Sequence, residues 1–164
     1  MGVMLGRERQ FPVLVPSVTV GTGGSSTGSA VVAGDVMGSA FGVSAAGGHE
    51  GGGVIVGVSV LFASLNATAN GRLALYGNAP SAVDEGTPYT FDPADTGIYI
   101  GQVVLDGGFV SAGAHFEQIN TGLMQAFHVN NSANRTLFAY YITDGTASHM
   151  TANPITLIMR VMQD

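Results

Sequence analysis

The chain has 164 residues, of which 46% are hydrophobic and only 10% are charged, and its formal net charge is −6. This composition excludes a disordered polyelectrolyte and predicts one domain with a sizeable apolar core. The basic residues are five arginines without a cluster, so nucleic acids and anionic membranes are not expected partners. The absence of cysteine excludes disulfides and thiolate metal sites.

Few charges on an apolar chain favour a surface that is partly covered by other subunits, so we expect an oligomer or a larger assembly. No apolar run reaches the ~18 residues that a membrane span needs. The first residues, MGVMLGRERQFPVLVP, lack the pattern of a signal peptide. We therefore expect the protein to be made in a cytoplasm and to remain soluble or assemble there.

The first predicted element is residues 11–20, FPVLVPSVTV, in which apolar residues alternate around Pro12 and Pro16. Because proline cannot donate a ladder hydrogen bond, this segment is either an edge strand or an extended arm that reaches a neighbour. Residues 21–28, GTGGSSTG, are typical of a flexible linker. We divide the chain into an extended N-terminal arm and Gly/Ser linker, residues 1–28, and a single β-sandwich domain, residues 29–164.

The most regular strand pattern lies in residues 53–77, GVIVGVSVLFASLNATANGRLALYG. Valine occupies every second position from Val54 to Val60, which is the period of a strand. The polar segment 65–71 is typical of a turn, and a return strand follows from Leu73. Both faces of the first strand are apolar or small, so we expect this pair at the centre of a two-layer structure.

The remaining chain alternates short apolar runs with turn residues such as Asn120-Thr121-Gly122. Strands are predicted within residues 30–43, 99–105, 109–119, 123–129, 135–143 and 155–162. One short helix is expected, with Asp92 as N-cap and Pro93 at its first position. The sequence therefore predicts an all-β fold: an antiparallel β-sandwich, jelly-roll-like, of about eight or nine strands, with one very short helix near 92–96.

The four histidines, His49, His115, His128 and His149, are the first candidates for metal or acid–base chemistry. His115 and Glu117 are two residues apart on one predicted strand face, a spacing that some metal sites use, and His128 is expected on a neighbouring strand. Isolated strand histidines are more often solvated or interface residues. We therefore predict no metal site from them.

Carboxylates gather in Asp84-Glu85 and in Asp92 with Asp95. Glycosidase chemistry needs two acids across a cleft, whereas capping explains Asp92 and Asp95, and an exposed loop explains the other two. A calcium ion in this loop stays open, because hard cations favour carboxylate-rich loops. A G-x-S-x-G elbow and a P-loop lysine are both missing. We predict no enzyme, no catalytic residues and no cofactor.

Four segments resemble small structural proteins of tailed bacteriophages, in their strands and turns. These are residues 51–60 (GGGVIVGVSV), 73–81 (LALYGNAPS), 91–95 (FDPAD) and 156–164 (TLIMRVMQD). The resemblance covers residues 11–164. It implies a capsid decoration, or cement, protein: a small non-enzymatic β-sandwich that binds the outer surface of the major capsid shell and stabilises it.

The implied partners are the major capsid protein and further copies of the chain, with a homotrimer favoured and a homodimer possible. The implied location is the outer surface of the virion capsid, after synthesis in the host cytoplasm. For the contact we select the N-terminal arm: Arg7 and Arg9 would pair with an acidic shell rim. Phe11, Val13 and Val15 would add a strand to a neighbour's sheet edge.

Two other functions are weighed against this one. A tail- or fibre-associated module that recognises a receptor or glycan would need exposed aromatic residues. Because the chain has no tryptophan, Tyr89, Tyr99, Tyr140 and Tyr141 would have to bind the sugar. A metal-dependent enzyme on a similar jelly roll would need convergent histidines.

Overall fold

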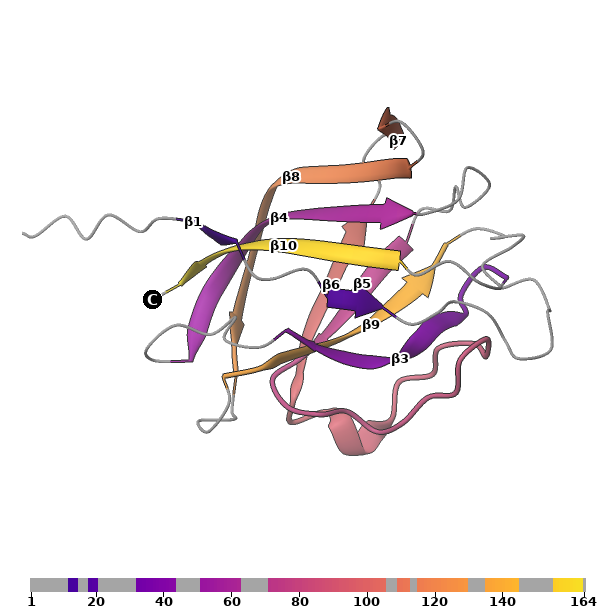
Figure 1. Cartoon of the computed structure of the whole chain (residues 1–164). Coiled ribbons are helices and arrows are strands. Elements are labelled where there is room, and N and C mark those ends of the chain that lie inside the picture. The colour runs from indigo at the N-terminus through magenta and orange to yellow at the C-terminus, as the bar shows by residue number, and fades with distance from the viewer. Residues whose placement is uncertain are drawn as a thin grey trace, which may run out of the picture.

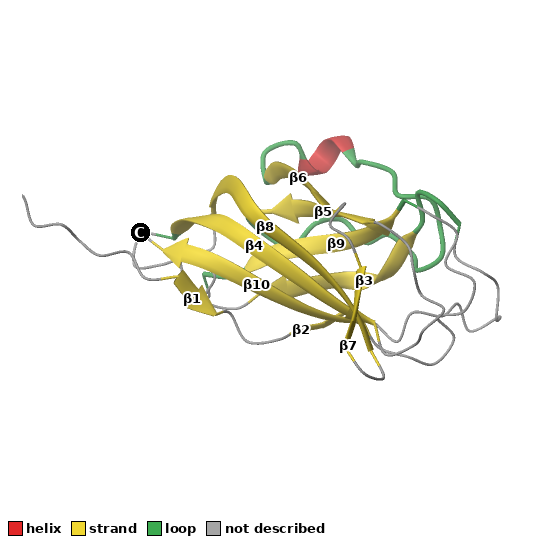
Figure 2. Cartoon of the chain, turned by 90° about the horizontal axis from the view of Figure 1, so that it is seen from above, coloured by secondary structure: helices red, strands yellow, loops and turns green. Residues whose placement is uncertain are grey.

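The computed structural model describes residues 12–14, 18–20, 32–43, 51–62, 71–105, 109–112, 115–129, 135–144 and 155–163. Within these ranges ten strands form two antiparallel sheets, which lie face to face in Figures 1 and 2. The strands are β1 (Pro12–Leu14), β2 (Val18–Val20), β3 (Val36–Val43), β4 (Gly52–Phe62), β5 (Gly71–Tyr76), β6 (Tyr99–Leu105), β7 (Phe109–Ala112), β8 (His115–His128), β9 (Leu137–Thr143) and β10 (Ile155–Gln163). The predicted all-β antiparallel sandwich is confirmed, and its jelly-roll-like connectivity stays a prediction.

One sheet, here the large sheet, has the strand order β1-β10-β4-β8-β7, and β2 also pairs with β10. The other, here the small sheet, has the order β3-β9-β5-β6. The predicted short helix is confirmed as one 3-10 turn, η1 (Pro93–Asp95), in the connection between β5 and β6. It is short because Gly97 and the β-branched Ile98 follow it at once.

The segment 11–20 contributes two strands instead of one. Val13 of β1 lies opposite Val161, and Thr19 of β2 lies opposite Thr156, so both strands pair with β10 of the same chain. This arrangement agrees with the edge-strand alternative for the segment, and its division into two strands contributes to a count of ten instead of the predicted eight or nine. Pro12 suits this place, because an edge strand has one row of amides that needs no ladder partner.

β4 and β5 do not form the expected hairpin. β4 is the central strand of the large sheet, whereas β5 lies inside the small sheet between β9 and β6. Eight residues, 63–70, separate the two strands. That is more than a tight hairpin uses and enough to span the ~10 Å between two packed sheets. The period-two pattern placed both strands correctly, but it carries no information about their partners.

The expected break at Asn120-Thr121-Gly122 is also wrong. β8 runs continuously through these residues, whereas the predicted strand 109–119 is divided, because β7 ends at Ala112 and β8 begins at His115. In the β4–β8 ladder Ile55 lies opposite Gln125, and Gly57 lies opposite Thr121, so one residue of β4 faces three of β8. Asn120 and Thr121 stay paired with β4, and Gly122 begins a bulge of residues 122–124 that bends the sheet without ending the strand.

The main core fills the space between the two sheets. The large sheet contributes side chains such as Ile55, Phe127 and Met159, and the small sheet contributes Leu73 and Leu75, all at most 7% exposed. Burial of each of these side chains stabilises the fold by roughly 1.5–3 kcal/mol. This apolar layer holds the sandwich together.

Two glycines allow close approach in this core. A Cβ atom at Gly53 would lie 2.7 Å from the Met162 carbonyl oxygen, and one at Gly71 would lie 2.5 Å from the Tyr141 hydroxyl. Both positions therefore require a residue without a side chain. Gly53 lies in the predicted central strand, whereas Gly71, expected in the turn 65–71, is the first residue of β5.

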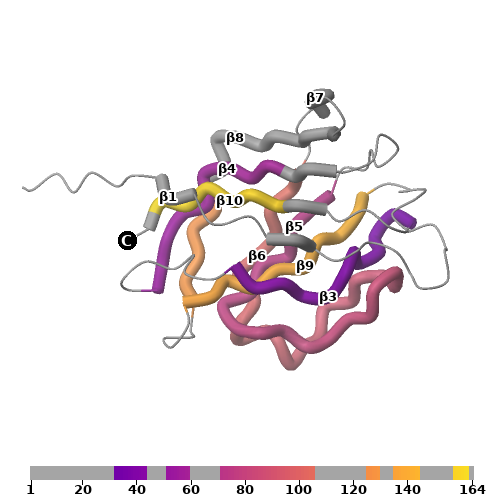
Figure 3. Tube along the Cα trace, in the orientation of Figure 1, coloured from indigo at the N-terminus to yellow at the C-terminus, as the bar shows by residue number. Residues whose placement is uncertain are grey.

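A second, smaller cluster covers the other face of the small sheet. It consists of Val36, Ala74, Tyr76, Tyr140 and Ile142, all buried. The connection from β5 to β6, residues 77–98, runs over this face, as the continuous tube below β3 and β9 shows (Figure 3). The small sheet is thus covered on both faces, by the large sheet on one side and by a loop on the other.

Candidate functional site

The connection 77–98, here the covering loop, is held to the small sheet by main-chain hydrogen bonds. The Gly77 amide donates to the Ile98 carbonyl at 2.7 Å and closes the base of the loop. The Val36 amide donates to Thr87, and the Tyr89 amide donates to Gly34, both at 2.9 Å. Loops of this length within a compact domain are uncommon and are usually functional, which directs attention to the space beneath it.

The turn η1 begins as the sequence predicts. The carboxylate of Asp92 accepts a hydrogen bond from the Ala94 amide at 2.8 Å, and Pro93 occupies the first helical position. The Thr96 hydroxyl donates to the Pro93 carbonyl at 2.7 Å and closes the turn. Asp92 therefore acts as the predicted cap.

Asp95 has a further role that the sequence did not indicate. It is 7% exposed, and its carboxylate accepts two hydrogen bonds from Ser81: the amide at 2.9 Å and the hydroxyl at 3.1 Å. Hydrogen bonds to a charged acceptor are stronger than neutral ones. Asp95 thus joins two parts of the covering loop that are 14 residues apart in the chain.

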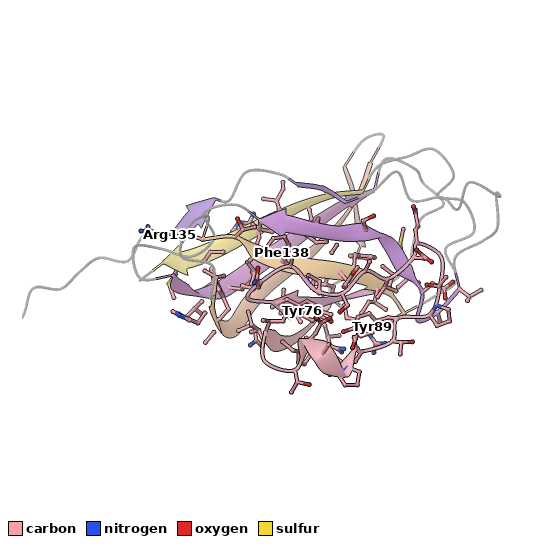
Figure 4. All side chains as sticks on the ribbon, turned by 90° about the horizontal axis from the view of Figure 1, so that it is seen from below. Tyr76, Tyr89, Arg135 and Phe138 are labelled. Atoms are coloured by element: carbon pink, nitrogen blue, oxygen red, sulfur yellow. The ribbon has the colours of Figure 1, made fainter. Side chains whose placement is uncertain are left out.

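Four tyrosines pack together under the covering loop. The ring of Tyr76 meets the rings of Tyr99 and Tyr140 edge to face, with centroid distances of 5.4 and 6.1 Å. Tyr76 and Tyr89 share a hydrogen bond between their hydroxyl groups, and Figure 4 shows the two side chains next to each other near the short helix. Edge-to-face pairs of this kind contribute ~0.5–1.5 kcal/mol each beyond burial.

The burial of these rings raises the pKa values of Tyr76, Tyr89 and Tyr140 above the ordinary value for tyrosine. For Tyr76 the hydrogen bond with Tyr89 adds to this effect, whereas for Tyr140 a backbone hydrogen bond opposes it. All three are therefore neutral phenols at physiological pH. They supply hydrogen-bonding hydroxyls rather than charge.

Tyr140 fixes the loop above it. Its hydroxyl donates to the Ser81 carbonyl at 2.7 Å and accepts from the Val83 amide at 3.1 Å. Since Asp95 holds the amide and hydroxyl of Ser81, this residue is bound from both sides. The segment 81–83 is thus anchored by one strand residue and one loop residue.

These anchors leave a pocket of about 510 Å³ between the covering loop and the small sheet. Tyr76 and Tyr140 are among its lining residues, with Asp95, Asp84 and the 38% exposed Phe91. Its volume lies within the range of small-molecule sites, roughly 300–1,000 Å³. We therefore take it as the candidate functional site and call it the tyrosine pocket.

The described lining of the tyrosine pocket has carboxylates and hydroxyls but no arginine, lysine or histidine. Such a lining disfavours anions, because nothing in it balances a negative charge. Among the described residues no group of three histidine, aspartate or glutamate side chains is placed to hold a metal ion, so this part of the structure does not support the calcium alternative. The arrangement is suited to binding a ligand with hydrogen-bond donors.

The predicted histidine arrangement is not formed. His115 and His128 lie at opposite ends of the same strand, β8, and not on neighbouring strands. His128 is exposed, and the side chains of His115 and Glu117 are outside the described part, as are His49 and His149. The expectation failed because the predicted break in this segment is a bulge.

Within the described ranges no helix is long and apolar enough to cross a membrane.

Of the four tyrosines proposed for sugar binding, Tyr89, Tyr99 and Tyr140 lie together, but Tyr141 does not. Its side chain points into the core between the sheets and is 0% exposed, because neighbours in a strand face opposite sides. Tyr76 was missed. Strand alternation could have identified it, because alternating side chains place Tyr76 on the same face as Ala74 and opposite to Leu75.

Of the predicted contact residues, Arg7, Arg9, Phe11 and Val15 lie outside the described residues. Val13 lies in β1, at the edge of the large sheet, opposite Val161. β1 therefore lies at an edge of the large sheet, whereas the covering loop lies on the side of the small sheet (Figure 2).

No protein-family model, no curated protein and no solved structure matches this chain.

Proposed function

We propose that this protein is a non-enzymatic structural protein of a virion, a decoration protein that binds the outer surface of a major capsid shell and stabilises it. The resemblance of its strands and turns to small structural proteins of tailed bacteriophages supports this function. So does the composition, with few charges and many apolar residues. The observation that carries the proposal is the character of the outer face of the large sheet.

That face is largely apolar where β10 and β4 pair. Val54 lies opposite Met162, and Ser59 lies opposite Ile158. These side chains face away from the main core, because the intervening residues of β10, such as Met159, belong to it. Val54, Ile158 and Met162 are half-buried. Apolar side chains grouped on a sheet face favour a protein-binding surface.

Charge is distributed unevenly between the covering loop and the outer face of the β10–β4 pair. Asp84, Glu85, Asp92 and Asp95 all belong to the covering loop, on the small-sheet side. On the outer face of the β10–β4 pair the charged residue is Arg160, opposite Gly57. We infer that the large sheet faces the shell and that the acidic covering loop faces the solvent.

The N-terminal segment extends this surface. Because β1 and β2 continue the large sheet beyond β10, Pro12 lies at the edge of the proposed contact face. Arg7 and Arg9 precede Pro12 in the sequence, and we propose that they pair with an acidic rim of the shell. A homotrimer, or a homodimer, would bind through several such faces at once, and multivalent attachment strengthens weak contacts.

The test is saturation binding to parent shells that lack the protein, measured by cosedimentation and copy number. A plateau at a simple ratio to the major capsid protein is the expected result. A plateau of a few copies per particle would instead place the protein at the tail or a fibre, and no binding would refute the proposal.

A pair of matched variants tests the contact face itself. Ile158→Gln replaces an apolar side chain on the outer face of the large sheet, and Val104→Gln replaces one that is 54% exposed on the small sheet. Loss of one buried aliphatic contact costs about 1.5 kcal/mol, or roughly tenfold in affinity per site. Ile158→Gln should weaken binding by this factor and Val104→Gln should not. Equal binding by the two folded variants would contradict the assignment of the face.

A further inference from the structure

The tyrosine pocket lies on the side of the sandwich that the proposed shell contact leaves unused. Tyr76 and Tyr140, which line it, belong to the cluster on the outer face of the small sheet, while Leu75 and Tyr141 point into the main core. Occupation of this pocket would therefore not compete with attachment through the large sheet. We propose that the tyrosine pocket is a binding site for a neutral, hydroxyl-rich ligand, one unit of a sugar chain.

The polar groups of the pocket match sugar hydroxyls. Asp84 and Asp92 are exposed carboxylates in its lining, and carboxylates accept hydrogen bonds from hydroxyl groups. Thr87 and Thr90 donate their own hydroxyl protons to main-chain carbonyls, at 2.6 and 3.4 Å, and keep lone pairs that accept further hydrogen bonds. An anionic ligand finds no cationic side chain in the described lining.

The apolar part of the lining suits the C–H face of a sugar ring. Phe91 is 38% exposed, and its ring meets that of Tyr99 edge to face, with a centroid distance of 5.0 Å. Pro88 and Pro93 add two rigid apolar rings to the lining. A sugar ring presents hydroxyl groups around its edge and C–H groups on its faces, so it can use both kinds of surface.

An organic ammonium ion is the competing ligand, because carboxylates and aromatic rings can also hold a cation. The arrangement of the rings disfavours it. Tyr76 and Tyr140 meet edge to face, and Tyr89 is tilted against Tyr140 with a centroid distance of 6.1 Å, so these rings pack against each other. A cation–π site needs an open ring face, and the packing of these tyrosines leaves Phe91 as the exposed ring of the described lining, so a cation would lack the surrounding aromatic rings of a cation–π cage.

The pocket is also built before any ligand arrives. Its floor residue Tyr140 is 1% exposed and is fixed by hydrogen bonds to Ser81 and Val83, and Asp95 is fixed by Ser81. A site that needs no ordering on binding loses less entropy when a ligand enters. This preorganisation favours binding of a ligand as small as a single sugar unit, which offers few contacts to offset an ordering cost.

The experiment titrates methyl glycosides of glucose, galactose, mannose and N-acetylglucosamine into the full chain, with the ring signals of the tyrosines and Phe91 followed by NMR. We expect saturable shifts at Phe91 and Tyr89 with one or more of these probes, with a Kd on the order of 1 mM. Tetramethylammonium is titrated in parallel. Saturation by the ammonium ion alone, or no saturable shift at the pocket with any glycoside, would overturn the proposal.

Two pocket variants and one matched control test whether the glycoside binds in the tyrosine pocket. Asp84→Asn removes an exposed carboxylate of the lining and should weaken binding about tenfold, and Phe91→Ala should weaken it about fivefold. Asp144→Asn makes the same charge change outside the described lining of the pocket. Each variant is first shown to fold by circular dichroism. If all three bind the glycoside as the parent chain does, the sugar lies elsewhere and the assignment is wrong.

Discussion

The bond between Asp95 and Ser81 offers the sharpest test of how the covering loop is held. Asp95→Ala removes a carboxylate that is 7% exposed and leaves the amide and hydroxyl of Ser81 without their acceptor. Asp95→Asn keeps one carbonyl oxygen in nearly the same place. Asp84→Ala is the matched control, since it removes the same charge from an exposed position of the same loop.

The expected loss follows from the contacts. A hydrogen bond to a charged group contributes roughly 1.5–3 kcal/mol, and two such bonds are lost. Ser81 is half-buried, so water replaces part of what Asp95 supplied. We therefore expect Asp95→Ala to lower the free energy of unfolding by about 2–3 kcal/mol and Asp95→Asn by about half of that. Asp84→Ala should stay within about 0.5 kcal/mol of the parent chain.

The assay is equilibrium urea unfolding followed by tyrosine fluorescence, which suits a chain with five tyrosines and no tryptophan. Hydrogen exchange at the Ser81 amide gives a local readout of the same bond. The predicted order of stability is Asp84→Ala, then Asp95→Asn, then Asp95→Ala. Equal stability of Asp84→Ala and Asp95→Ala, with protection of the Ser81 amide unchanged, would refute the reasoning.

Three further changes test the core and the tyrosines. Gly71→Ala would place a Cβ atom 2.5 Å from the Tyr141 hydroxyl and should lower the free energy of unfolding by about 1–3 kcal/mol, measured by thermal or urea unfolding. Gly97→Ala is the control and should be neutral, because nothing lies within 4 Å of its Cβ atom. Leu75→Ala should cost about 2–5 kcal/mol, because Leu75 is 0% exposed in the main core, and a cost below that of a surface change would contradict its placement. Burial raises the pKa values of Tyr76 and Tyr141, so unfolded tyrosines ionise near pH 10.0 while the folded ones stay protonated. Tyrosine ionisation should therefore leave the free energy of unfolding unchanged below that pH and lower it above, by up to about 1.4 kcal/mol per pH unit for each buried tyrosine. A free energy of unfolding that is flat up to pH 11, about one unit above the ordinary pKa, would argue against their burial.

Local patterns in the sequence were sufficient for the class of fold and for several elements. The predicted strand 99–105 coincides with β6, and the cap at Asp92 forms as its position before Pro93 indicated. These features depend on residues close together in the chain, where period-two alternation and capping chemistry act. The same local patterns misplaced one boundary, since a turn-forming residue such as Gly122 also suits a bulge.

The partners of the strands could not be read from the same patterns. β4 and β5 follow each other in the chain but lie in different sheets, and both ends of β10 accept strands from the N-terminal segment. An alternating strand with two apolar faces fits equally well beside several neighbours. Which neighbour it takes depends on the packing of all strands at once.

For the candidate site, too, some features follow from the sequence and others only from the tertiary structure. Composition alone determined that the chain is apolar, poor in charge and without thiol chemistry, and strand periodicity determined that it folds as a β-sandwich. Only the tertiary structure brought Ser81 to Asp95 and gathered Tyr76, Tyr89 and Tyr140 beneath one loop. The physical reason is separation along the chain: these contacts join residues up to 64 positions apart, from Tyr76 to Tyr140. They exist only when β5 pairs with β9 and the loop folds back over the sheet.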